Sequence, residues 1–173
     1  FANRLIEHCE EFTGIRLAAL RGVGATPHYF GSESFIDEVA QELEIDALEY
    51  RLHLLRNSPK ALAVMKEVAV MSNWGESSEG RAKGIAFSDY HGSYAAYVAE
   101  VSLNAKTNVV KVHNIWLAHD AGLIVQPDNT IAQLEGGMVF GLSNALKESI
   151  RIQDGKVQNN NFFGQSGYPD PLS

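Results

Sequence analysis

The chain has 173 residues, 45% of them hydrophobic, which is enough to bury one sizeable core. Its net charge of −7 and pI near 5.3 argue against a nucleic-acid-binding surface and against a polybasic membrane anchor. A single cysteine, Cys9, excludes an internal disulfide framework, and no apolar run approaches the roughly 20 residues of a transmembrane segment.

The two ends of the sequence lack a recognisable opening or closing element. The chain starts at Phe1, with neither an initiator methionine nor a signal peptide, and its last residues are rich in Gly, Pro and Ser. We therefore expect a segment of a longer polypeptide.

Residues 1–72 predict a helical segment. The glycines and the proline of Gly22–Pro27 predict a turn or loop. Ser32 or Ser34 then caps the first helix. Hydrophobic periodicity predicts three helices, at 34–44, 46–55 and 59–71.

Residues 73–83 are polar and predict a surface linker, and a sheet-plus-helix segment follows at 84–173. Stretches rich in Val, Ile and Tyr predict three strands, at 85–87, 93–103 and 109–118, with a hairpin connection at 104–108. A glycine-rich helix at 129–147 precedes a closing hairpin, 150–153 and 157–160, around an Asp-Gly turn. The predicted class is α+β, with helices first and then a mixed sheet with a glycine-rich helix.

The glycine-rich helix carries the clearest local signal for a ligand. Gly136, Gly137 and Gly141 lie inside it, where each costs about 1 kcal/mol relative to alanine. Such glycines are typical of a close approach by another backbone or by a cofactor. The helix follows the turn Asp120–Gly122, and its Gln133 carboxamide and backbone N–H groups suit a large polar or anionic ligand.

Three other features could carry chemistry, and each has a simpler interpretation. Arg21 could bind a carboxylate, an oxo group or a carbonyl, or it could be an exposed arginine before a loop. Gln133 could pair with the edge of a heterocycle, or it could face solvent. Gln126 begins a helix-entry turn, capped by Asp128 or Asn129, which could also contact a nucleotide tail. The six histidines show no metal-ligand spacing, so we expect no metal ligand in this chain.

A series of motifs in fixed order goes beyond these local patterns. The first half of the chain contains Arg21–Gly24, Glu33–Ala40 and Asp46–Arg51. The second half contains Trp74-Gly75, Gly84–Phe87, Val98–Ser102, Asp120–Gly122, Gln133–Gly137, Gly141–Ser143 and Asp154–Asn159. Taken together they resemble the molybdenum hydroxylases, the xanthine dehydrogenase and aldehyde oxidase family, in the molybdopterin-binding large subunit. The later motifs resemble the branch formed by the isoquinoline 1-oxidoreductase beta subunits.

This resemblance implies an oxidoreductase that hydroxylates an N-heterocycle or oxidises an aldehyde, with water as the oxygen donor. It implies molybdenum held by molybdopterin in the cytosine dinucleotide form. Arg21 matches the arginine that orients the substrate, and Gln133 matches the glutamine that hydrogen-bonds the pterin. Val125 and Gln126 lie where the dinucleotide tail is held, and Gly136 is a further cofactor-binding residue.

The resemblance also implies partner chains and a catalytic residue that this sequence does not contain. Electrons leave through [2Fe-2S] clusters on a separate iron–sulfur subunit, and the rest of the same large subunit completes the pocket. The catalytic glutamate lies outside this chain, so the fragment alone is expected to be inactive. The family usually has Asn-Pro-Asp at Gln126–Asp128 and a cysteine at Ala121.

Two matters stay open from the sequence. A non-catalytic scaffold or a small-ligand-binding paralogue on the same fold is the alternative to an enzyme. Members of the branch are often exported, which favours the periplasm, and the cytoplasm is the alternative compartment.

Overall fold

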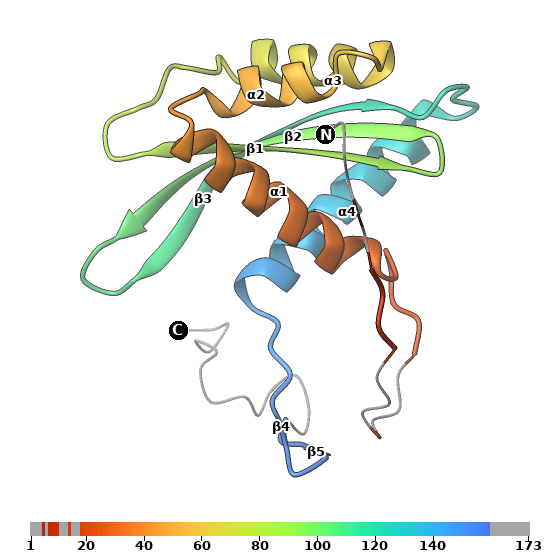
Figure 1. The fold of residues 1–173 in the computed structure, drawn as a ribbon, viewed down its shortest axis with the longest axis vertical. Coiled ribbons are helices and arrows are strands. Elements are labelled where there is room, and N and C mark those ends of the chain that lie inside the picture. Colours follow the sequence, from red (N-terminus) through yellow and green to blue (C-terminus); the bar gives the residue numbers. More distant parts are fainter. Residues whose placement is uncertain (1–4, 6, 11–13, 15–17, 160–173) are drawn as a thin grey trace. The chain divides into compact units, whose positions relative to one another are not determined.

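The computed structural model describes residues 5, 7–10, 14 and 18–159, which form two compact units (Figure 1). One unit spans Gly22–Val125 and carries three helices and a three-stranded sheet. The other combines the described parts of Phe1–Arg21 and Gln126–Ser173, and it carries a long helix and a small hairpin. The α+β class is confirmed. The division into 1–72, 73–83 and 84–173 stays a prediction.

The first helix, α1 (Ala25–Glu42), begins upstream of both predicted serine caps. Gly22 has a φ of 83°, and its carbonyl accepts the Ala25 N–H at 2.8 Å, which turns the chain into the helix. A Cβ at Gly22 would lie 2.5 Å from Oγ1 of Thr26, so a larger residue would clash there. Pro27 fits the first turn, where its missing N–H costs nothing. The predicted turn is therefore present at residues 21–24, whereas its extension to Pro27 and the helix start at 34 were wrong.

The next two helices confirm the sequence prediction. Helix α2 spans Ala47–Leu54, and Oδ1 of its N-cap Asp46 accepts the backbone N–H groups of Leu48 and Glu49 at 2.9 and 3.1 Å. Helix α3 spans Pro59–Met71 with its proline in the first turn. Because the last carbonyls of a helix lack partners, the Lys83 ammonium is well placed after α3, where it donates to the carbonyl of Ser72 at 2.6 Å.

The sheet has the order β1-β2-β3, with β1 (Ala82–Tyr90), β2 (Ser93–Asn104) and β3 (Val109–Asp120). Both pairings are antiparallel, so the expected mixed sheet is corrected on this point. Short connections join consecutive strands, and such connections permit only antiparallel pairing.

One hydrophobic core lies between α3 and the sheet (Figure 1). In the register, Val98 lies opposite Ile85 on one side and Trp116 on the other, so these side chains share a face. Met65 and Val68 of α3 are completely buried against this core. The core therefore fixes the position of α3 on the sheet.

The outer edge of β1 is closed by α1. The Glu33 carboxylate accepts the backbone N–H of Phe87 at 2.9 Å, and the Tyr29 hydroxyl donates to the backbone carbonyl of Asp89. Burial, followed by the hydrogen bond to Asp89, raises the pKa of Tyr29. An edge strand presents unpaired backbone groups, and these two side chains pair two of them.

In the second unit, α4 spans Pro127–Leu146, close to the predicted glycine-rich helix. None of its residues is buried. The predicted closing hairpin is confirmed in β4 (Ile152–Gln153) and β5 (Lys156–Val157), with positive φ at the two turn residues between them. No helix among the described residues is long and apolar enough to cross a membrane.

Candidate functional site

Arg21 and Gln133 lie 112 positions apart in the sequence, and the structure brings them into direct contact. Nη2 of Arg21 donates to the side-chain carbonyl Oε1 of Gln133 at 3.2 Å. The same nitrogen donates to the backbone carbonyl of Gln133 at 3.1 Å. Two residues that the sequence singled out separately therefore form one cluster on α4.

The glycines of α4 lie under the same guanidinium. A Cβ at Gly136 would meet Nη1 of Arg21 at 3.7 Å, and a Cβ at Gly137 would meet Nη2 at 3.4 Å. The guanidinium carbon also lies 5.9 Å from the ring centroid of Phe140. Residues three and four apart lie on the same face of a helix. The Arg21 guanidinium therefore contacts one face of α4, from Gln133 to Phe140.

The cluster keeps unused hydrogen-bond donors. Within the described residues, Arg21 makes no ion pair, and its Nη1 and Nε have no hydrogen-bond acceptor. The Nε2 amide of Gln133 likewise has no acceptor among them. An exposed positive charge whose N–H groups lack acceptors in the described part of the chain suits a ligand rich in anionic oxygen. This donor set fits the phosphate-bearing pterin that the resemblance implies.

Gln126 begins α4 in a way that the sequence did not predict. Its side-chain carbonyl accepts the Asn129 N–H at 2.8 Å, so Gln126 is the N-cap and the predicted caps, Asp128 and Asn129, were wrong. Pro127 takes the first helical position. Val125, beside it, is 89% exposed. The predicted contact of Val125 and Gln126 with a dinucleotide tail stays a prediction.

Asp120 stabilises the turn that follows β3, which was predicted from the sequence at Asp120–Gly122. Its Oδ1 accepts the Gly122 N–H at 2.8 Å, and its Oδ2 lies 3.5 Å from Nζ of Lys60. The Gly122 N–H, followed by the charge of Lys60, holds the pKa of Asp120 below its ordinary value. Nδ1 of the neighbouring His119 has no hydrogen-bond partner within the described residues. Asp120 therefore shapes the turn.

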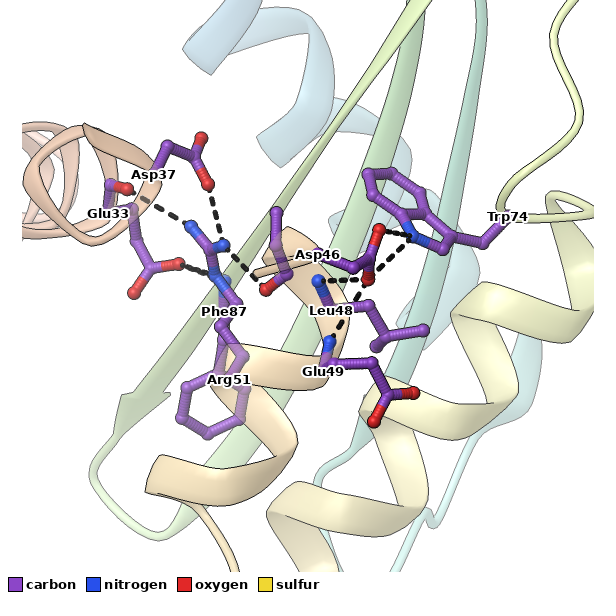
Figure 2. A network of polar contacts seen from close by, with 9 residues as sticks. Glu33, Asp37, Asp46, Leu48, Glu49, Arg51, Trp74 and Phe87 are labelled. Carbon is purple, nitrogen blue, oxygen red and sulfur yellow. Dashed lines mark hydrogen bonds and ion pairs between the residues drawn. The ribbon is translucent and has the colours of Figure 1, made fainter. Parts of the chain in front are cut away.

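Sequence reasoning missed a buried polar network around Arg51 (Figure 2). Arg51 is 1% exposed, and its guanidinium contacts the carboxylates of Glu33 at 2.8 Å and Asp37 at 2.6 Å. Glu33 also binds Phe87 of β1, so the network joins α1, α2 and the sheet. The sequence signal for this network was the position of Arg51 on the inward face of the short helix α2.

No group of three or more potential metal ligands occurs in the part of the chain that the structure describes. The candidate site consists of the hydrogen-bond donors of Arg21 and Gln133 and of the glycine face of α4.

Comparison with known proteins gives a family match and several relatives. Residues 36–165 match the molybdopterin cofactor-binding domain. The beta subunit of the isoquinoline 1-oxidoreductase of Brevundimonas diminuta is 38% identical over 83% of this chain and 19% of that protein. The B subunit of the nicotinate dehydrogenase of Pseudomonas putida is 31% identical over 90% of this chain and 14% of that protein.

A third relative carries a different cofactor in its name. The membrane-bound aldehyde dehydrogenase (pyrroloquinoline-quinone) of Gluconacetobacter polyoxogenes is 31% identical over 79% of this chain and 20% of that protein. The chain thus spans a fifth or less of the length of these relatives. Since the family match covers most of the chain and the relatives include the predicted branch, the chain belongs to the molybdopterin cofactor-binding domain family.

Proposed function

We propose that these residues form one part of the molybdopterin pocket in the large subunit of an oxidoreductase. The enzyme oxidises an N-heterocycle or an aldehyde, with water as the oxygen donor. Two relatives are named for a heterocyclic compound and one for an aldehyde, and this supports both substrate classes. The observation that carries the proposal is the Arg21–Gln133 cluster on the glycine face of α4, whose remaining donors have no acceptor among the described residues.

In this proposal each site residue has its own task. Gln133 hydrogen-bonds the pterin, and Gly136 lets the cofactor approach the helix backbone. Val125 and Gln126 hold the tail of a cytosine dinucleotide form of the cofactor. Bound molybdenum and its pterin supply the oxidation and the transfer of oxygen from water.

Arg21 stabilises negative charge that develops on the substrate. Its Nη2 is engaged by Gln133, but its Nη1 and Nε have no acceptor among the described residues and remain able to donate. A fixed cationic donor aimed at developing charge contributes about 100-fold to 1,000-fold to turnover in well-studied enzymes. Arg21 therefore serves the reaction through Nη1 and Nε.

The remaining parts of the proposed enzyme lie outside these residues. They are the rest of the large subunit with its catalytic glutamate, and a small subunit with [2Fe-2S] clusters. The relatives are named as subunits, which supports a partner chain.

The test is the cofactor content of the complete gene product with Gln133→Ala. We expect bound pterin and molybdenum to fall at least about tenfold, the equivalent of roughly 1.4 kcal/mol of binding free energy. Gln41→Ala, at an exposed position of α1, is the matched control and should leave both unchanged. A Gln133→Ala protein with wild-type cofactor content would refute the assignment.

A further inference from the structure

The contact between Arg21 and Gln133 determines which end of the carboxamide is free. Arginine has only hydrogen-bond donors, so the side-chain atom of Gln133 at 3.2 Å from Nη2 is the carbonyl oxygen. The same nitrogen also donates to the backbone carbonyl of Gln133 at 3.1 Å. One nitrogen of Arg21 thus binds both oxygens of residue 133, and among the described residues the Nε2 amide has no acceptor.

We propose that Arg21 is a positioning residue for Gln133, which holds the carboxamide so that its N–H group faces the bound ligand. The ligand must then present a hydrogen-bond acceptor at this point, such as a carbonyl oxygen, a ring nitrogen or a phosphate oxygen. This inference rests on the proposed function, because that function supplies the ligand, a pterin cofactor.

Such positioning has a physical basis in the chain itself. An unrestrained glutamine on a helix surface can turn either end of its amide outward, and binding then has to restrict its side-chain rotamers. Gly137 permits the close contact, since a Cβ there would already lie 3.4 Å from Nη2. The ring of Phe140, 5.9 Å from the guanidinium carbon, supports the arginine from the next turn.

The test compares two substitutions of Gln133 in the complete gene product. Gln133→Glu keeps an oxygen for Arg21, with added charge attraction, but replaces the N–H donor by a second acceptor. Gln133→Ala removes both groups. Two quantities are measured: bound pterin per polypeptide, and the thermal unfolding midpoint of protein from a host that makes no molybdopterin. Gln41→Glu gives the same charge change at an exposed position of α1.

For Gln133→Glu we expect an unfolding midpoint equal to or above that of the wild type, and at least about a tenfold loss of bound pterin. Gln41→Glu should leave bound pterin unchanged. Wild-type pterin content in Gln133→Glu would overturn the inference, because a donor would then not be required.

The double variant tests the positioning itself. Arg21→Ala should lower bound pterin at least about threefold, and adding it to Gln133→Ala should cause no further loss, since it acts through Gln133. Arg56→Ala, at another exposed arginine, is the control. Wild-type pterin content in Arg21→Ala, or losses that multiply in the double variant, would overturn the inference. Failure of the proposed function is distinguishable, because the wild-type protein itself would then hold no pterin.

Discussion

Arg51 and Glu33 bind each other at two points. Nε of Arg51 donates to the Glu33 carboxylate at 2.8 Å, and Nη2 donates to the Glu33 backbone carbonyl at 3.0 Å (Figure 2). Since Glu33 also accepts the backbone N–H of Phe87, this pair connects two helices with the edge of β1. The Arg51 guanidinium is almost completely buried, so the ion pair with Glu33 is shielded from water.

Substitution of Arg51 tests this connection. Arg51→Ala should lower the free energy of unfolding by about 3–5 kcal/mol, because it leaves the Glu33 and Asp37 carboxylates without their partner. Arg51→Lys should also be destabilising, since an ammonium cannot reproduce the planar set of donors. Urea unfolding measures both. The exposed Arg56→Ala should stay within about 0.5 kcal/mol of the wild type, and an equally small effect of Arg51→Ala would contradict the account.

The buried carboxylate of Glu100 predicts how the free energy of unfolding depends on pH. Hydrogen bonds from the Asn114 amide and from Arg81, each at 2.8 Å, hold the pKa of Glu100 below its ordinary value. Its contribution to folding is therefore complete above the unfolded-state pKa and is lost as the pH falls through the lower folded-state pKa.

We expect the urea midpoint to decrease as the pH is lowered from about 5 toward 3, the range in which carboxylates titrate. Glu100→Gln should reduce this decrease. It should not abolish it, because Asp120 also has a lowered pKa. A Glu100→Gln protein with an unchanged pH profile would show that Glu100 does not contribute.

The glycine face of α4 predicts opposite effects on stability and on cofactor content. A Cβ at Gly136 would make only an ordinary contact with Arg21 at 3.7 Å, so Gly136→Ala should raise the stability of the cofactor-free protein by up to about 1 kcal/mol. The same methyl group should lower bound pterin if the cofactor approaches the backbone there.

Gly31→Ala is the matched control for this substitution. Gly31 lies inside α1 with no atom within 4 Å of a Cβ, so it should give the gain in stability without loss of pterin. Equal pterin content in both variants would refute the role of Gly136.

Arg21→Ala should lower turnover per bound molybdenum by at least about tenfold, with the proposed heterocycle or aldehyde as substrate. Expressing turnover per molybdenum separates the effect of Arg21 on the substrate from its effect on cofactor content. Unchanged turnover per molybdenum would refute a role of Arg21 on the substrate and would leave only its contact with Gln133.

The sequence predicted those elements whose ends carry strong local signals. Asp46 is a preferred N-cap, and Pro59 is suited to a first helical turn, so α2 and α3 were placed almost correctly. The start of α1 has no side-chain cap, and α4 is capped by a glutamine, which is not a preferred residue there. Both starts were therefore misplaced.

The site was predicted only as separate residues. Arg21 and Gln133 are 112 positions apart, and no local spacing relates residues at such a distance. The ordered motifs identified the family, but they did not show that one arginine nitrogen binds both oxygens of Gln133. Tertiary contacts of this kind require the folded chain.

The most direct test of the central claim is the cofactor content of the wild-type complete gene product, purified from a host that makes molybdopterin. Molybdenum is measured by elemental analysis, and pterin and pyrroloquinoline quinone by chromatography. We predict molybdenum and pterin in equal amounts and no pyrroloquinoline quinone. A folded protein with neither molybdenum nor pterin would contradict the account and would favour a non-catalytic paralogue.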